Sequence, residues 1–298
     1  MLEQVVVLGG MGEVGTLLSR SLAASGVRVL RVDREARSGG IPPRDFLAAD
    51  VADAAAPNGA LLDAIAAADG VIVCLPEDVA LVALDGVVGA MARGALWVDT
   101  LSVKTPICRA LGERARGLEI LSINPMFAPA LGWRSQAVAA VELAGGPRSD
   151  ALLGLLAAWG ARVERLSAGD HDARTAAIQV ATHAAVLAFG AVLLDLGYET
   201  DTALCLATPP HLLMLALLSR MVGGNPTVYA EIQRHHPHGE AVRQAMGRAM
   251  AALSETAADP AAATLRRWFE ELELRLSPAR GYLRELGDRL VAQTAGET

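Results

Sequence analysis

The stretch Val5–Gly15 reads V-V-V-L-G-G-M-G-E-V-G and decides the fold of the first half of the chain. An apolar run typical of a buried strand ends in a glycine-rich turn, and a helical pattern begins directly after it. Gly10, Gly12 and Gly15 match the G-x-G-x-x-G fingerprint of dinucleotide-binding domains. In that fingerprint the glycines permit a tight turn, close approach of a pyrophosphate, and packing of the helix against the strand. The free N–H groups at the helix start would hold the phosphates.

The turn therefore predicts a nicotinamide dinucleotide as cofactor. Asp33 ends the second expected strand, where a carboxylate would bind the adenosine ribose hydroxyls and repel a 2′-phosphate. This favours NAD, while Arg34 and Arg37 leave NADP open. The residues assigned to the cofactor are Gly10, Met11, Gly12, Glu13, Val14, Gly15, Asp33, Arg34, Leu75 and Pro76.

Short apolar runs alternate with helical patterns over residues 1–168. Such runs are typical of strands buried on both faces of a parallel sheet, and their alternation with helices predicts a doubly wound α/β domain of the Rossmann type. The later runs follow one another more closely, so part of the sheet can be antiparallel. The expected strands are Val5–Leu8, Val27–Asp33, Val71–Leu75, Leu96–Asp99, Ile120–Ile123, Val138–Leu143 and Arg162–Leu166.

Residues 169–298 show only helical patterns, which predicts an all-helical second domain. Its helices are so apolar that we expect a second subunit to bury one face of them, in a homodimer. The most apolar stretch, Ala176–Leu196, contains Gln179, His183 and Asp195. A membrane span needs about 20 nearly uninterrupted apolar residues. We therefore expect a deeply buried helix of a soluble protein and no membrane partner.

The composition narrows the class of protein further. A net charge of −7 argues against nucleic acid as the main partner, because phosphate binding needs a basic face. The three cysteines are widely spaced, as in reduced cytosolic proteins, and the N-terminus begins with a strand pattern and no signal segment. We therefore expect a cytoplasmic protein. Pro237 interrupts the histidine-rich stretch 235–238, so no metal site is expected there.

Three further motifs follow the glycine turn: D-T-L-S-V-K at 99–104, S-I-N-P-M-F-A-P at 122–129, and D-H-D-A-R-T-A-A-I-Q-V-A-T-H at 170–183. In this order and spacing the four motifs resemble the prephenate dehydrogenase family, which includes cyclohexadienyl and arogenate dehydrogenases. The resemblance implies a Rossmann domain followed by a helical dimerisation domain, with the active site between them. It also implies an NAD(P)-dependent oxidative decarboxylation of a cyclohexadiene dicarboxylate. Hydride leaves ring atom C4, the ring carboxylate leaves as carbon dioxide, and the ring becomes aromatic.

The resemblance also assigns site residues. Ser102 falls on a serine near the nicotinamide and the C4 substituent, and Lys104 on the lysine of the same turn, assigned here to substrate binding. His183 falls on a histidine lining the substrate pocket, and Tyr229 on a tyrosine near it. Arg220 falls on the arginine that binds a substrate carboxylate. An arginine in so apolar a helix is costly to bury without an anion, although an acidic residue of a partner helix is an alternative ligand.

One departure from the family bears directly on the chemistry. Where the family usually has His-Pro, with a histidine that accepts the proton of the C4 hydroxyl, this chain has Asn124-Pro125. An amide oxygen accepts a hydrogen bond but takes up no proton. Because general base catalysis is typically worth about 10²–10⁴ in rate, this loss should cripple a prephenate dehydrogenase.

Three explanations remain open for Asn124. The substrate can be 4-amino-4-deoxyprephenate, whose C4 amine promotes hydride departure without a base, giving 4-aminophenylpyruvate, a precursor of aminophenylalanine-derived natural products. Alternatively, His183, or Ser102 through water, replaces the base on prephenate or arogenate. The third explanation is a non-catalytic, NAD-binding regulatory relative. We favour the first, because Ser102, His183 and Arg220 are retained and the amine removes the need for the missing group.

Overall fold

The computed structural model describes residues 2–35, 42–53, 59–256 and 262–295. The chain divides into two compact units, Met1–Arg174 and Thr175–Thr298, called here the N-terminal and the C-terminal unit. The domain boundary between residues 168 and 169 stays a prediction. Arg37, which the sequence offers as a contact for NADP, lies outside the described residues.

The N-terminal unit is built on an eight-stranded sheet with the strand order β3-β2-β1-β4-β5-β6-β7-β8. Neighbouring strands are parallel except β6 and β7, which are antiparallel. The doubly wound α/β fold and its antiparallel part are thus confirmed. The strands are β1 (Gln4–Leu8), β2 (Arg28–Asp33), β3 (Phe46–Ala48), β4 (Gly70–Val73), β5 (Leu96–Asp99), β6 (Glu119–Pro125), β7 (Ala137–Ala144) and β8 (Arg162–Arg165).

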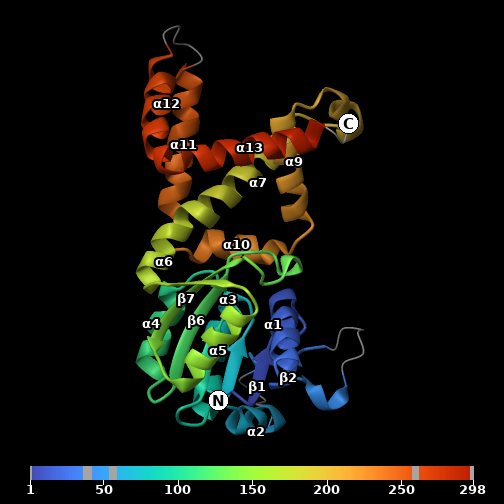
Figure 1. Ribbon diagram of the computed structural model, residues 1–298, viewed down its shortest axis with the longest axis vertical. Coiled ribbons are helices and arrows are strands. Elements are labelled where there is room, and N and C mark those ends of the chain that lie inside the picture. Colours follow the sequence, from blue (N-terminus) through green and yellow to red (C-terminus); the bar gives the residue numbers. More distant parts are fainter. Residues whose placement is uncertain (1, 36–41, 54–58, 257–261, 296–298) are drawn as a thin grey trace. The chain divides into compact units, whose positions relative to one another are not determined.

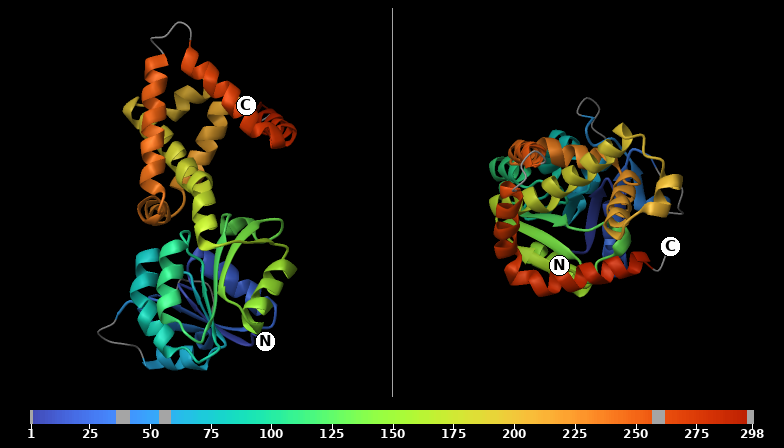
Figure 2. Two further views of the ribbon diagram at one scale, coloured as in Figure 1. Left: turned by 90° about the vertical axis from the view of Figure 1, so that its left-hand side faces the viewer. Right: turned by 90° about the horizontal axis from the view of Figure 1, so that it is seen from above.

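Helices cover both faces of this sheet (Figures 1 and 2). Buried residues of α2, α3 and α4 pack on one face, and those of α1 and α5 pack on the other. Both faces are therefore removed from water, as the unbroken apolar strands require. The helices are α1 (Glu13–Ala24), η1 (Pro43–Asp45), α2 (Gly59–Ala67), α3 (Glu77–Ala90), α4 (Thr105–Arg114), η2 (Pro129–Leu131), α5 (Pro147–Ala158) and α6 (Ala168–Thr175).

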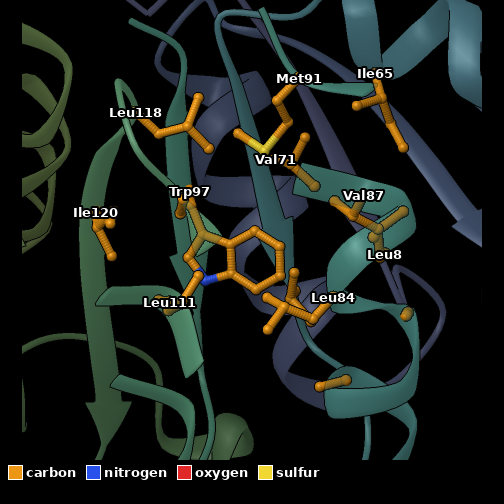
Figure 3. Close-up of a cluster of buried hydrophobic side chains, with 14 of the residues drawn as sticks. Leu8, Ile65, Val71, Leu84, Val87, Met91, Trp97, Leu111, Leu118 and Ile120 are labelled. Carbon is orange, nitrogen blue, oxygen red and sulfur yellow. The ribbon is translucent and has the colours of Figure 1, made fainter. Parts of the chain in front are cut away.

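Trp97 on β5 fills the core between the sheet and α3 and α4 (Figure 3). It lies among Leu84, Val87 and Leu111 and is fully buried. Its indole Nε1 donates a hydrogen bond to Asp99 Oδ2 at 3.3 Å, so the one polar atom of the ring has a partner. This core fixes the ends of β5 and β6, from which the candidate site residues follow.

The glycine turn between β1 and α1 leaves no room for side chains. Gly9 has φ +72°, and a Cβ there would lie 2.3 Å from the carbonyl oxygen of Cys74. A Cβ on Gly15 would lie 2.3 Å from the carbonyl oxygen of Gly9, which is how the third glycine of the fingerprint lets the helix pack against the turn. Gly9 adopts the left-handed conformation, although the sequence pattern drew attention only to the glycines after it.

A buried ion pair joins the ends of β5, β6 and the start of α4. Lys104 Nζ lies 3.1 Å from Asp99 Oδ1, and both side chains are fully buried. The ammonium also donates to the Ile123 carbonyl oxygen at 2.7 Å. Ser122 Oγ donates to Asp99 Oδ1 at 2.7 Å. These hydrogen bonds compensate for the desolvation that an isolated buried charge would suffer.

The described part of the C-terminal unit contains helices and no strand, in agreement with the predicted fold class. Pro209 and Pro210 begin α9 after a break from the preceding helical segment, because proline fits the first helical positions. The helices are η3 (Ala176–Ala181, a π-helix), α7 (Thr182–Asp195), α8 (Thr200–Ala203), η4 (Leu204–Leu206), α9 (Pro209–Val222), α10 (Pro226–His235), α11 (Gly239–Thr256), α12 (Ala263–Leu276), η5 (Ser277–Ala279) and α13 (Arg280–Ala295).

The apolar helices of this unit are exposed in the single chain. Among its described residues, only Val180, Val186 and Ile232 belong to the buried hydrophobic set. By length and composition the helical stretch Ala168–Asp195 could cross a membrane, and 11% of its apolar 18-residue window is buried within the chain. The expectation of a deeply buried helix at Ala176–Leu196 is therefore wrong for one chain, because too little of the same chain packs against it.

Replacing Lys104 with methionine should destabilise the protein by about 3–5 kcal/mol, because the Asp99 carboxylate would stay buried without its cation. Chemical denaturation monitored by circular dichroism measures this loss. Arg114→Ala is the matched control, since it breaks exposed ion pairs with Asp85 and Glu113 and should cost less than about 1 kcal/mol. Equal denaturation midpoints for the two variants would contradict the role assigned to the buried pair.

Gly15→Ala should cost about 1–3 kcal/mol, because the new methyl group would collide with the Gly9 carbonyl oxygen. Gly86→Ala in α3 is the control: a Cβ there meets nothing within 4 Å, so alanine should leave stability unchanged or raise it. Thermal unfolding of both variants checks this. An unchanged midpoint for Gly15→Ala would mean that the turn has room that the structure does not show.

Candidate active site

Asn124 lies near the end of β6 and is 2% exposed. Strand β6 pairs with β7 at this position, and Asn124 lies opposite Ala139. Its Nδ2 lies 3.1 Å from Nε2 of His171, which comes from α6. The residue that departs from the family pattern is thus a buried amide in direct contact with a histidine.

His171 is held by its neighbour Asp172. The ring Nδ1 lies 2.8 Å from Asp172 Oδ1, and both side chains are 1% exposed. The same carboxylate accepts the backbone N–H groups of Lys104, at 2.9 Å, and Thr105, at 2.8 Å. Burial alone would raise the pKa of Asp172, but the hydrogen bonds from His171, Thr105 and Lys104 outweigh it and hold the pKa at about 2. Asp172 is therefore ionised at neutral pH.

The sequence pattern did not identify His171 as part of this group. The D-H-D motif at 170–172 predicts that Asp170 caps the helix, with His171 as a cap and hinge residue. In the structure Ser167 Oγ accepts the Asp170 N–H at 3.0 Å and donates to its carboxylate at 2.7 Å. Ser167 thus caps α6 and Asp170 lies inside the helix, so the cap prediction for Asp170 is wrong. The sequence signal for the buried histidine is the carboxylate that follows His171 directly. The partner of the ring, Asn124, is 47 residues away and leaves no local pattern.

Ser102 and Lys104 lie in the turn after β5, but only Ser102 is partly exposed. The assignment of Lys104 to substrate binding is not supported by the structure. Its ammonium is buried and already bonded to Asp99 and to the Ile123 carbonyl, so no donor is directed to a ligand. We therefore assign Lys104 to the support of the turn that carries Ser102.

The glycine turn lies at the carboxyl edge of the sheet, between the ends of β2 and β4, where strand order changes direction from β1. Open α/β sheets bind dinucleotides at this point. Gly12 is the N-cap of α1 and supplies no side-chain cap, so the first N–H groups of the helix are not taken by a capping side chain. The cradle of Gly9, Gly10 and Gly15, where a Cβ would collide with backbone, fits a pyrophosphate close to the chain.

The remaining residues assigned to the cofactor surround this turn. Asp33, the last residue of β2, accepts the Met11 N–H at 3.1 Å and the Arg34 N–H at 2.9 Å. Its carboxylate is thus held beside the glycine turn, as a ribose contact requires. Leu75 follows β4 and is half-buried, and Pro76 is the N-cap of α3.

The C-terminal unit brings His183 and Tyr229 together. Their rings meet edge to face, with centroids 5.1 Å apart and planes at 88°. Burial lowers the pKa of His183, so the ring is neutral at pH 7. Its Nδ1 is buried and has no hydrogen-bond partner among the described residues. An unsatisfied buried ring nitrogen on a residue assigned to the substrate pocket is a candidate ligand contact.

Arg220 is exposed, whereas the sequence led us to expect a buried arginine. It lies in the last turn of α9, and its side chain is exposed in the single chain. No ion pair to it forms within the described residues, so none of their acidic side chains accounts for it. The argument from burial therefore does not hold for one chain, and its assignment to a substrate carboxylate stays a prediction.

A π-helix precedes His183. The segment η3 widens the helical turn, and the Val180 carbonyl accepts a hydrogen bond from Gln233 Nε2 at 3.0 Å. Thr182 Oγ1 donates to the Ala177 carbonyl at 3.3 Å. Widened turns of this kind are frequent at functional sites. Here the widening shifts the side chains that follow it, including His183, relative to a regular helix.

The chain is similar to known proteins along most of its length. Residues 167–271 match the family described as prephenate dehydrogenase, dimerization domain. The chain is 43% identical over 285 residues to a 4-amino-4-deoxyprephenate dehydrogenase of Streptomyces pristinaespiralis, covering 96% of this chain and 93% of that protein. It is 30% identical over 234 residues to a T-protein of Enterobacter agglomerans, covering 78% of this chain and 56% of that protein.

Solved structures share the fold. A prephenate dehydrogenase from A. aeolicus, in complex with hydroxyphenyl propionate and NAD+, aligns with a TM-score of 0.66 and 14% identity over 94% of this chain and 99% of that one. An arogenate dehydrogenase from Synechocystis aligns with a TM-score of 0.61 and 18% identity over 94% and 99% of the two chains. With the sequence identity to the Streptomyces protein over nearly the whole length, these matches lead to one conclusion: the chain belongs to the prephenate dehydrogenase family of oxidoreductases.

Proposed function

We propose that the protein catalyses the NAD-dependent oxidative decarboxylation of 4-amino-4-deoxyprephenate to 4-aminophenylpyruvate. One observation carries the proposal: the position of the expected general base is occupied by Asn124, a buried amide held against His171. An amide at this point orients a donor on the substrate but takes up no proton. The 43% identity to a protein named for this substrate supports the same choice.

The chemistry of the amine explains why a base can be absent. When bound, NAD+ supplies the hydride acceptor. In the neutral amine the nitrogen lone pair supports the loss of hydride from C4. The bond from the ring to its carboxylate then breaks, carbon dioxide leaves, and the electron pair of that bond completes the aromatic ring. The amine keeps both hydrogens throughout, so no proton has to be removed and the approximately 10²–10⁴-fold benefit of a base is not needed.

The other assigned residues keep the roles that the family resemblance gives them. Ser102, in the turn after β5, contacts the nicotinamide end and the C4 substituent. The glycine turn and Asp33 hold NAD in preference to NADP, since the Asp33 carboxylate repels a 2′-phosphate. His183 and Tyr229 form an aromatic wall of the substrate pocket. Arg220 binds a substrate carboxylate through its guanidinium group.

We also propose that the protein is a cytoplasmic homodimer formed through the C-terminal unit. Apart from Val82, Leu131 and Leu143, the large hydrophobic residues exposed on the described chain all lie in that unit. Soluble monomers rarely expose so much apolar surface together. The match to a dimerisation domain favours a second copy over a membrane as the surface that covers it. The three cysteines are free thiols, as the reducing cytoplasm would keep them.

With NAD, the purified protein should reduce the cofactor rapidly on 4-amino-4-deoxyprephenate and at least about 100-fold more slowly on prephenate or arogenate, measured as absorbance at 340 nm. Asn124→His should gain prephenate activity without improving the amino reaction, because it restores the base that only the hydroxyl substrate needs. Equal turnover of prephenate and the amino substrate would contradict the proposal and favour the alternative of a prephenate or arogenate dehydrogenase. No signal with any of the three would indicate a regulatory NAD-binding protein.

The wild-type protein should sediment at about twice its 31.0 kDa chain mass. Ile178→Glu combined with Leu194→Glu places charges on the exposed face of η3 and α7 and should shift the protein toward the monomer. Val82→Glu is the control, since Val82 is also exposed but lies on α3 of the N-terminal unit. Analytical ultracentrifugation compares the three. A double variant that remains as dimeric as the control would exclude this face from the interface.

A further inference from the structure

We infer that His171, held by Asp172, is a positioning residue that turns the Asn124 amide so that its carbonyl oxygen meets the C4 substituent of the substrate. The inference rests on the proposed function and identifies what makes Asn124 selective for an amine. His171 touches neither the reacting atoms nor the cofactor in this account. It acts through Asn124.

When the His171 ring is neutral, the hydrogen bonds of this group fix its tautomer and the orientation of the Asn124 amide. Asp172 is ionised and accepts the Lys104 and Thr105 N–H groups, so it has no proton to donate. The ring nitrogen that faces it, His171 Nδ1, must therefore carry hydrogen. In the neutral ring Nε2 is then an acceptor, and it takes a hydrogen from Asn124 Nδ2 at 3.1 Å.

Rotation of the Asn124 side-chain amide would cost free energy. Turning the Asn124 side chain by 180° about its last bond would bring Oδ1 against the lone pair of His171 Nε2, two acceptors facing each other in a buried site. The neighbouring charges do not reverse this preference, because the Lys104 ammonium is bonded to Asp99 and to the Ile123 carbonyl. The nitrogen end of the amide is thus committed to His171, and the oxygen end is left for a substrate.

The orientation matters for the reaction. A neutral amine has two N–H hydrogens and one lone pair. An oxygen acceptor takes one hydrogen and leaves the lone pair free to support hydride loss from C4. A rotated amide would present an N–H donor, which would bind that lone pair and withdraw the electrons that the reaction needs. His171 therefore decides whether Asn124 assists the amine or opposes it.

A double-mutant cycle tests the coupling. His171→Leu should lower kcat on 4-amino-4-deoxyprephenate about 100-fold with little change in KM, because the amide is free to rotate in the bound substrate complex. Asn124→Ala should have a similar effect. The double variant should be no slower than the slower single variant, since His171 then has nothing to position. Effects that multiply would overturn the inference, as they would show that His171 acts independently of Asn124.

A conservative variant separates positioning from packing. Asp172→Asn has the same shape and keeps an acceptor oxygen for one of the two backbone N–H groups, and it releases the constraint on the His171 tautomer. It should lower kcat about tenfold while thermal unfolding shows a folded protein. An Asp172→Asn variant with an unchanged kcat would contradict the role assigned to His171.

Nitrogen-15 NMR of histidine-labelled protein gives a readout that needs no turnover, and the chain has only six histidines. The signal missing in His171→Leu identifies His171. We expect hydrogen on Nδ1 and none on Nε2 in the wild type, and a mixture of tautomers in Asp172→Asn. Hydrogen on Nε2 in the wild type would overturn the inference. A protein that fails to oxidise the amino substrate would refute the proposed function, while the tautomer would still be decided by this spectrum.

Discussion

The site depends on the hydrogen bonds that the buried carboxylate of Asp172 accepts. This carboxylate accepts the N–H groups of Lys104 and Thr105, at the start of α4, although it lies 68 and 67 residues further along the chain. A negative charge at this end of a helix is favoured by the helix dipole, and Lys104 offers no side-chain cap of its own. The same carboxylate holds the ring of His171, which in turn contacts Asn124. One buried charge thus connects α4, α6 and β6.

The sheet could be predicted from the sequence because strands buried on both faces are almost uninterrupted apolar runs. The strand that was missed, β3, has only three residues, too few to form a pattern. The glycine turn was found through its spacing, whereas the left-handed residue Gly9 lies outside the fingerprint and shows itself only through φ +72°. Local periodicity therefore predicts elements well and predicts individual backbone conformations poorly.

The site residues show a different limit. Asn124 was found because it breaks a family motif, but its partner His171 is distant in the chain and was read as part of a cap. The family resemblance assigns Lys104 and Arg220 to the substrate. The structure buries the ammonium of Lys104 in an ion pair and leaves Arg220 exposed on the single chain. Burial and pairing depend on contacts between distant segments, which a single sequence does not contain.

The central claim is that a fixed acceptor without a base selects an amine over a hydroxyl at C4. A competition experiment tests it most directly: equal concentrations of 4-amino-4-deoxyprephenate and prephenate are mixed with the enzyme and NAD, and the early products are separated and quantified. Their ratio equals the ratio of the two kcat/KM values. The account predicts that 4-aminophenylpyruvate exceeds 4-hydroxyphenylpyruvate by at least about 100-fold. Comparable amounts of the two products would contradict it.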